Sequence, residues 1–293
     1  MKQLRPERIV PVFVLLVALV LGTGCSKKID PRLQEGYDLV VANKIDEAVA
    51  LANALLADDP KNAEARNLLG LALYKSGDAE GSVREYRQAL DIDPSYAEAH
   101  FNLGNSFKLL ERPADAEKEF LESIRLQKKF VLAHYNLGVL YQDSGRIDPA
   151  VAEYERCIEY DPQFYFAYVA LGNIRYQQGD FEGAITNLSR SLELDPTAKQ
   201  LRVVLGNAYM QSGRADGVQL AENEYRAAAG IDSEYLDAVY SVGVALAAQN
   251  RNEEAKEWFV KARELSADNP KKDAMRQQIA RFFEQFGEDS TSE

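Results

Sequence analysis

The chain has 293 residues, of which 46% are hydrophobic and 27% are charged, a composition typical of folded rather than disordered proteins. Its formal net charge is −12 at pH 7, and its lysines and arginines form no dense basic stripe. This charge argues against nucleic acid as a partner, because nucleic-acid binding needs cations that neutralise phosphates.

The first 24 residues have the pattern of a secretory signal. Three basic residues precede an unbroken apolar run over residues 9–21, and small residues then lead to Cys25. This run of 13 residues is shorter than the roughly 20 that a membrane-spanning helix needs, so a permanent transmembrane anchor is the weaker interpretation. The stretch LGTGCSKK resembles a bacterial lipoprotein signal, which implies that Cys25 is acylated and becomes the first residue of the mature chain.

The lipoprotein resemblance has one departure. The position three residues before the cysteine is usually aliphatic, but here it is Gly22, so ordinary signal cleavage and an uncleaved anchor remain alternatives. Ser26, after the cysteine, resembles the sorting signal for the outer membrane, which implies a lipid-anchored chain facing the periplasm. Residues 25–28 would then be a short tether, and Cys157 would have no partner for an internal disulfide.

The rest of the chain is dominated by an internal repeat. Glycines recur every 34 residues and then once after 37, at Gly36, Gly70, Gly104, Gly138, Gly172, Gly206 and Gly243. A small residue follows each glycine twelve places later, except after Gly206, so three extra residues lie between Gly206 and Ala221. An aromatic residue often follows four places after the small residue, and a proline often marks the end of the unit.

This combination of spacings resembles the tetratricopeptide repeat, in which each unit is a pair of antiparallel helices. The resemblance implies an all-α fold, a right-handed superhelical solenoid of seven helix-turn-helix units. The units are residues 29–62, 63–96, 97–130, 131–164, 165–198, 199–235 and 236–269. We expect the glycine and alanine positions to be small because the helix axes approach there to roughly 8 to 10 Å. Stability should come from the stacking of neighbouring units.

Two histidines and a cysteine are the first candidates for chemistry in the repeats. His134 lies 34 residues after His100, and other units hold arginine, tyrosine or valine there, so we interpret the position as requiring bulk rather than imidazole. Cys157 stands where other units have alanine or serine, and there a thiol acts as a small hydrophobic residue. The sequence has no glycine-rich phosphate loop, HExxH or GxSxG motif. We therefore predict no catalytic residue, no metal site and no cofactor.

The inner, concave wall of tetratricopeptide proteins is formed by the second, fifth, ninth and twelfth residues of each unit. In the third to fifth units, these and adjacent positions are rich in aromatic and amide side chains, which predicts a groove for an extended peptide. The groove candidates are Phe101, Asn102, Asn105, Tyr135, Asn136, Val139, Phe166, Asn173 and Tyr176. The alternative is that the aromatic rings pack sideways between units and that the asparagines only solvate the wall.

One binding mode of the family is testable directly. Members that hold the C-terminal tails of chaperones bind the terminal carboxylate with two asparagines and three cations. Asn105 and Asn136 match the asparagines, but the cation positions are occupied by Phe101, Phe166 and Ala170. We therefore predict that a free C-terminal carboxylate is not the preferred ligand.

The C-terminal residues predict a cap for the solenoid. Residues 270–287 are expected to form a capping helix, because five apolar side chains fall on one helical face. These side chains are Met275, Ile279, Phe282, Phe283 and Phe286. Residues 288–293 are polar and predict a disordered tail.

Two functional hypotheses follow from the resemblances, both for a non-catalytic protein–protein interaction scaffold. Lipoproteins of similar layout include the tetratricopeptide pilotins that assist the assembly of type IV pilus secretins in the outer membrane, although those usually carry six units. The alternative is an adaptor that docks and regulates cell-wall hydrolases, or a scaffold of another envelope system. In either case the partner is a protein or extended peptide in the groove, and acylated Cys25 binds the membrane.

Overall fold

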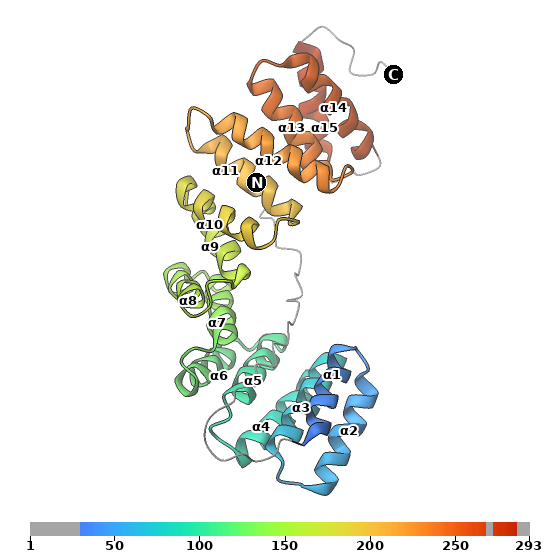
Figure 1. The fold of residues 1–293 in the computed structure, drawn as a ribbon, viewed down its shortest axis with the longest axis vertical. Coiled ribbons are helices and arrows are strands. Elements are labelled where there is room, and N and C mark those ends of the chain that lie inside the picture. The colour runs from blue at the N-terminus through green and yellow to red at the C-terminus, as the bar shows by residue number, and fades with distance from the viewer. Residues whose placement is uncertain (1–29, 268–271, 286–293) are drawn as a thin grey trace. The chain divides into compact units, whose positions relative to one another are not determined.

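The computed structural model describes residues 30–267 and 272–285, and these residues form 15 helices and no strand, which confirms the predicted all-α class. The signal sequence, Cys25, Phe286 and the predicted tail lie outside the described residues. The helices are α1 Pro31–Val41, α2 Ile45–Asp58, α3 Ala63–Ser76, α4 Ala79–Ile92, α5 Ala97–Leu109, α6 Pro113–Leu126, α7 Val131–Asp143, α8 Ile147–Tyr160, α9 Tyr165–Gln177, α10 Phe181–Leu194, α11 Lys199–Gln211, α12 Gly217–Ile231, α13 Leu236–Ala248, α14 Asn252–Ser266 and α15 Asp273–Gln285 (Figure 1).

The chain divides into two compact units, and the division falls within α7, after Ala133. In the N-terminal unit, α1 packs on α2, α3 on α4 and α5 on α6, and α2 and α4 also contact the first helix of the next pair. In the C-terminal unit the same pattern runs from α8 to α14. Consecutive helices therefore form hairpins, and within each unit neighbouring hairpins bury their apolar faces against one another.

The recurring glycine lets a large side chain of the second helix lie against the backbone of the first. A Cβ atom placed on Gly70 would lie 2.7 Å from Cε1 of Tyr86, and one on Gly138 would lie 2.7 Å from Cε1 of Tyr154. Both tyrosines are buried. The same relation joins Gly104 to Phe120, Gly172 to Leu188, Gly206 to Tyr225 and Gly243 to Phe259. The small residues expected at the helix contact are therefore confirmed, and the side chain that fills the space is the aromatic or leucine sixteen places later, or nineteen after Gly206.

The turn inside each hairpin contains one residue in the left-handed region of backbone φ. Four of the seven are glycines, with φ between 71° and 91°: Gly77, Gly145, Gly179 and Gly213. The equivalent residues in the other three turns are Asn43, Glu111 and Asn250, with φ of 58°, 55° and 59°. Asparagine tolerates this conformation because its short side chain bonds locally, whereas other residues with a Cβ atom lose about 1–2 kcal/mol. Glu111 is therefore the strained member of the series.

The three extra residues of the sixth unit lie where the sequence placed them. Five residues, 212–216, connect α11 to α12, whereas three, 178–180, connect α9 to α10. The third extra residue lengthens the helix, because α12 has 15 residues where α10 has 14. Gly217 opens α12 at a place where a Cβ atom would lie only 2.6 Å from the carbonyl oxygen of Tyr209. The insertion is absorbed at this turn, so the contact between Gly206 and Tyr225 is kept.

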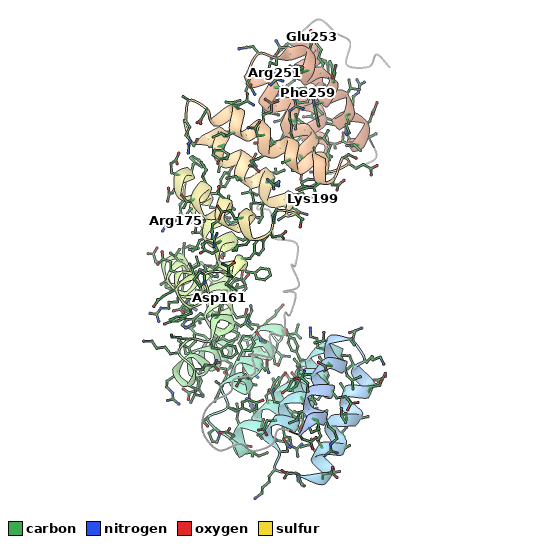
Figure 2. All side chains as sticks on the ribbon, viewed as in Figure 1. Asp161, Arg175, Lys199, Arg251, Glu253 and Phe259 are labelled. Atoms are coloured by element: carbon green, nitrogen blue, oxygen red, sulfur yellow. The ribbon has the colours of Figure 1, made fainter. Side chains whose placement is uncertain are left out.

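Helix α15 covers the last hairpin, as the predicted capping helix should. Ile279 and Phe283 are buried, and Met275 and Phe282 pack at the edge of the same core. The ring centroid of Phe282 lies 4.6 Å from that of Phe259, which is placed among α13, α14 and α15 (Figure 2). Four of the five apolar residues predicted for one face therefore pack on the hairpin.

The strain at Glu111 predicts that Glu111→Gly stabilises the protein. Its side chain is exposed, and glycine adopts a positive φ without steric cost, so we expect the free energy of unfolding to rise by about 1 kcal/mol. Urea unfolding followed by circular dichroism measures the change. The matched control is Glu155→Gly, at an exposed position inside α8, which should lower stability by a similar amount. Equal effects of the two substitutions would contradict the assignment of strain.

The glycine–ring contact predicts opposite effects for the same substitution at two helical glycines. At Gly138 a new methyl group would meet the buried Tyr154 ring, so Gly138→Ala should cost about 1–3 kcal/mol through overpacking. At Gly230, inside α12, a Cβ atom would meet nothing within 4 Å, so Gly230→Ala should stabilise by up to about 1 kcal/mol through helix propensity. Thermal melting of both variants tests this. A neutral Gly138→Ala would show that the ring moves aside freely.

Candidate functional site

The groove candidates of the third unit are largely packed inside the N-terminal unit. Phe101, on α5, is only 5% exposed, and its ring centroid lies 6.0 Å from that of Phe120 and 5.0 Å from that of Phe130. Asn105, one turn further along α5, is 7% exposed. The interpretation of Phe101 as an open aromatic of the groove is therefore wrong at this position, because its ring fills the space between helices.

Asn102 is engaged in a ladder of polar side chains that crosses the first helices of three hairpins. Its Nδ2 group donates to Oδ1 of Asn67 at 3.0 Å, and Nδ2 of Asn67 donates to the hydroxyl oxygen of Tyr37 at 3.0 Å. Asn67 is buried, so its amide would be costly to leave unpaired. One donor hydrogen of Asn102 thus holds α5 to α3 rather than a peptide backbone.

The candidates of the fourth and fifth units lie in the C-terminal unit, where two of them meet. The ring of Tyr135 lies 5.9 Å from that of Phe166, 5.3 Å from that of Phe164 and 5.7 Å from that of Tyr154, measured between centroids. Burial raises the pKa of the Tyr135 hydroxyl to about 12. Tyr135 therefore belongs to an aromatic cluster that joins two hairpins, as the sideways-packing alternative expected. Asn136, Val139 and Asn173 are half-buried on α7 and α9.

Tyr176, another groove candidate, lines a cavity. Its ring packs edge-on against Phe181 at 5.6 Å, and the cavity of about 210 Å³ beside it is bounded by α9, α11 and α13. The lining residues from α11 and α13 were not among the sequence candidates. The repeat register contained the signal that would have found them, since Asn207 and Met210 stand 34 residues after Asn173 and Tyr176. A groove across the third to fifth units stays a prediction.

The side chain of His134 does more than fill space, because it pairs with a carboxylate. His134 is fully buried, and its Nδ1 atom lies 2.5 Å from Oε2 of Glu153 on α8. The equivalent residues make the same pair in three other units: Arg66 with Glu85 at 2.9 Å, His100 with Glu119 at 2.6 Å, and Arg202 with Glu224 at 2.8 Å. The interpretation from size alone is corrected by this partner. The sequence signal for this pair was a glutamate that follows the histidine or arginine after nineteen residues, or after twenty-two residues in the sixth unit, which contains the insertion.

The charge of the partner shifts the titration of His100. Burial alone would lower the pKa of its imidazole, but the hydrogen bond and the negative charge of Glu119 outweigh burial and raise the pKa. The Nε2 atom also lies 3.3 Å from the carbonyl oxygen of Pro94. The contact with Glu119 ties the first and second helices of the hairpin together, and the two contacts account for both ring nitrogens.

Cys157 behaves as the sequence predicted. The thiol is in no disulfide among the described residues and is buried, and burial raises its pKa, which keeps it protonated at neutral pH. A protonated, enclosed thiol is a poor nucleophile and a poor metal ligand. Within the described residues no group of three or more histidine, cysteine, aspartate or glutamate side chains is placed to hold a metal ion.

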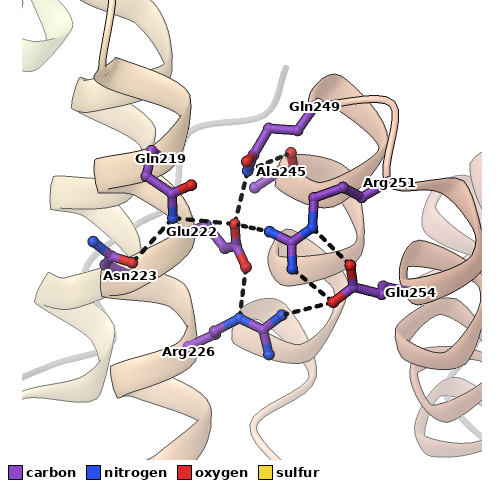
Figure 3. Close-up of polar contacts among 8 residues, drawn as sticks. All are labelled: Gln219, Glu222, Asn223, Arg226, Ala245, Gln249, Arg251 and Glu254. Carbon is purple, nitrogen blue, oxygen red and sulfur yellow. Dashed lines mark hydrogen bonds and ion pairs between the residues drawn. The ribbon is translucent and has the colours of Figure 1, made fainter.

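A buried carboxylate that the sequence did not reveal joins the last two hairpins. Glu222, on α12, is 3% exposed and accepts hydrogen bonds from Nε of Arg226 at 2.7 Å, NH1 of Arg251 at 2.8 Å and Nε2 of Gln249 at 2.7 Å (Figure 3). Glu254 closes the network by binding Arg251 at 2.6 Å. Burial alone would raise the pKa of Glu222, but the hydrogen bonds from Arg226 and Gln249 lower it. All the partners come from the chain itself, so this is a structural network.

None of the helices that the structure describes has the length and apolar content needed to cross a bilayer.

Comparison with known families supports the repeat. Residues 72–110 and 172–213 match the family model described as TPR repeat, and residues 131–164 match the one described as tetratricopeptide repeat. No curated protein matches the chain. The tetratricopeptide repeats predicted from the glycine and aromatic spacing are thereby confirmed.

Solved structures of similar fold are also helical repeat proteins. The C-terminal part of a TPR repeat-containing protein from Cytophaga hutchinsonii has a TM-score of 0.68 at 14% identity, covering 83% of this chain and 98% of that one. The APC/C hetero-tetramer Cut9–Hcn1 gives 0.61 at 14% identity, covering 86% of this chain and 49% of that one. A fragment of MamA from Desulfovibrio magneticus RS-1 gives 0.53 at 18% identity, covering 59% and 97%. At these identities the likeness concerns the fold alone, a tetratricopeptide solenoid.

The pairing of His134 with Glu153 predicts that His134→Phe is destabilising. Phenylalanine matches the bulk of the imidazole but leaves a carboxylate that is only 15% exposed without this hydrogen bond, at an expected cost of about 1–3 kcal/mol. Adding Glu153→Leu should recover part of the loss, because the unpaired carboxylate is removed as well. Urea unfolding of the two single variants and the double variant measures the coupling. A silent His134→Phe would restore the interpretation from size alone.

Proposed function

We propose that the chain is a non-catalytic protein–protein interaction scaffold whose repeats bind a protein partner through their first helices. The observation that carries this proposal is the chemistry of those helices in the C-terminal unit. Asn173, Tyr176 and Asn207 stand half-exposed on α9 and α11. Aromatic and amide side chains of this kind combine apolar contact area with hydrogen-bonding groups, which suits them to protein interfaces.

The scaffold acts, in this proposal, at the bacterial cell envelope, anchored to a membrane through acylated Cys25 and facing the periplasm. Support comes from the signal-like residues 1–24 and from Cys25 itself. A lipoprotein cysteine carries several acyl chains, and each buried methylene contributes about 0.8 kcal/mol, so the anchor would hold the chain stably. Ser26 favours the outer membrane. The proposed role is assistance in the assembly of an envelope complex such as a type IV pilus secretin.

The anchor is tested by comparing the wild-type chain with Cys25→Ala in its native host. We expect the wild-type chain in the membrane fraction, with an acylated Cys25 at its mature N-terminus by mass spectrometry. The variant should be unprocessed or soluble, because it lacks the thiol that is acylated. An unmodified Cys25 on wild-type protein in the soluble periplasm would overturn the lipoprotein assignment.

The partner is tested by cross-linking and affinity capture from detergent-solubilised membranes, with Cys25→Ala as the control for membrane residence. Recovery of a secretin or another envelope assembly factor is the expected result. Recovery of cell-wall hydrolases would favour the adaptor alternative, and failure to recover any partner reproducibly would argue against a scaffold role.

A further inference from the structure

The cavity beside Tyr176 is built by three consecutive first helices of the C-terminal unit. Tyr176 comes from α9, Asn207 and Met210 from α11, and Tyr240, Ser241 and Val244 from α13. These six residues are half-buried, whereas Tyr225, which also lines the cavity, is 2% exposed and forms its floor. The cavity thus lies on the wall formed by first helices, with the packed core of the sixth hairpin beneath it.

The orientation of one amide in this cavity is fixed from below. The hydroxyl of Tyr225 donates to Oδ1 of Asn207 at 2.7 Å. This bond directs Oδ1 of Asn207 towards the floor of the cavity, so the Nδ2 group of the same amide points away from the floor. The Nδ2 group has no hydrogen-bond acceptor among the described residues. Tyr225 is itself held in place by its contact with Gly206. Asn207 therefore presents a pre-oriented donor at the cavity wall, suited to a carbonyl oxygen.

The lining carries no charged side chain. Glu224, the acid next to the lining residue Tyr225 in the sequence, is paired with Arg202 at 2.8 Å, and Asp237, at the start of α13, is paired with Lys272. An acidic side chain or a terminal carboxylate placed in the cavity would lose hydration without gaining a cation. An uncharged aliphatic side chain would instead gain contact with Met210, Val244 and the tyrosine rings.

The size of the cavity favours an anchoring side chain over a free small molecule. Sites for small molecules usually enclose about 300–1,000 Å³, and this cavity, at about 210 Å³, is smaller. A single apolar residue buried in a pocket commonly supplies much of the binding energy of a protein interface, while its neighbours in the partner contact the surrounding surface. The formal charge of −12 favours a partner segment with basic rather than acidic neighbours.

We propose that the cavity between α9, α11 and α13 receives an uncharged aliphatic side chain of an extended partner segment, whose backbone carbonyl accepts a hydrogen bond from Nδ2 of Asn207. The inference rests on the scaffold function proposed above and names the chemistry of its partner. It places the anchor in the fifth to seventh units. The recognised segment is internal to the partner chain, carries no acidic residue at the anchor, and has basic flanking residues.

The probe is a phage-displayed library of random dodecapeptides selected on the full-length chain in detergent. Fluorescein-labelled copies of the selected peptide then report affinity by fluorescence polarisation. We expect a leucine-like or methionine-like residue at one constant position, with lysine or arginine nearby. Replacing that residue by aspartate should reduce affinity at least tenfold, and amidating the peptide C-terminus should leave affinity unchanged. Selection of acidic peptides, dependence on a free carboxylate, or no selected peptide would each overturn the proposal.

Two pairs of variants locate the site. Met210→Lys places a cation in the lining and should weaken binding at least tenfold, whereas Ile231→Lys makes a comparable change at an exposed position outside the cavity and should not. Asn207→Asp keeps the acceptor for Tyr225 but removes the amide donor, so it should weaken binding severalfold. Asn223→Asp is its control on α12. Melting curves establish that each variant is folded, and unchanged affinity of both folded cavity variants would overturn the proposal.

The outcome separates this inference from the proposed function. A chain that captures an envelope partner equally well with wild-type and Met210→Lys protein is a scaffold that uses another surface. If the chain binds the selected peptide through the cavity but captures no envelope partner, the binding site is supported and the proposed envelope role is contradicted.

Discussion

The contact between a glycine of the first helix and a ring of the second sets the geometry of the hairpins. Because the glycine has no side chain, the ring of Tyr154 or Tyr225 reaches the backbone of the facing helix. Its hydroxyl then emerges on the side of the first helix and meets an amide there, Gln142 for Tyr154 at 2.8 Å and Asn207 for Tyr225 at 2.7 Å. A packing requirement of the core thereby determines how polar groups are oriented on the wall formed by the first helices.

The repeat period was predictable from the sequence because each of its recurring residues is required by a single physical constraint. Glycine and alanine must be small, and the residue at the turn must accept a positive φ, so each position is visible in a single column of the repeat. The pairing of His134 with Glu153 was not predicted, because its two members lie in different columns of the repeat. The first column varies among histidine, arginine, tyrosine and valine, and only the glutamate in the second column shows that pairing with a carboxylate, and not bulk alone, explains the residue in four units.

The inner wall was predicted less well than the core, since the repeat position does not fix where a side chain points. Phe101 and Tyr135 were expected to face a ligand, but each rests on an aromatic residue at the end of its own unit, Phe130 or Phe164. The first and fifth units have Asn62 and Ala198 at that place, whereas the second and sixth have Tyr96 and Tyr235, so the presence of a ring there differs from unit to unit. The fifth and sixth units have valine, Val169 and Val203, where the third and fourth have Phe101 and Tyr135, and a cavity lies beside Tyr176.

The buried carboxylate of Glu222 shows how the end of the repeat array differs from its middle. Equivalent positions hold the apolar Val83, Val151 and Ile185 in three units, whose burial would be favourable in any similar arrangement of helices, and the half-buried Glu117 and Lys256 in the third and seventh units. A buried ion pair adds little net stability over such residues, but it accepts only a narrow range of geometries. By binding Arg226 on its own helix and Arg251 and Gln249 after α13, Glu222 fixes the register between the sixth and seventh hairpins. Helices α11 and α13, which supply most of the cavity, belong to those two hairpins. A fixed register would reduce the ordering cost of the binding proposed for the cavity. The charge network and the cavity therefore belong to one arrangement of the last two hairpins, in which the specific packing of the network holds the lining of the cavity in place.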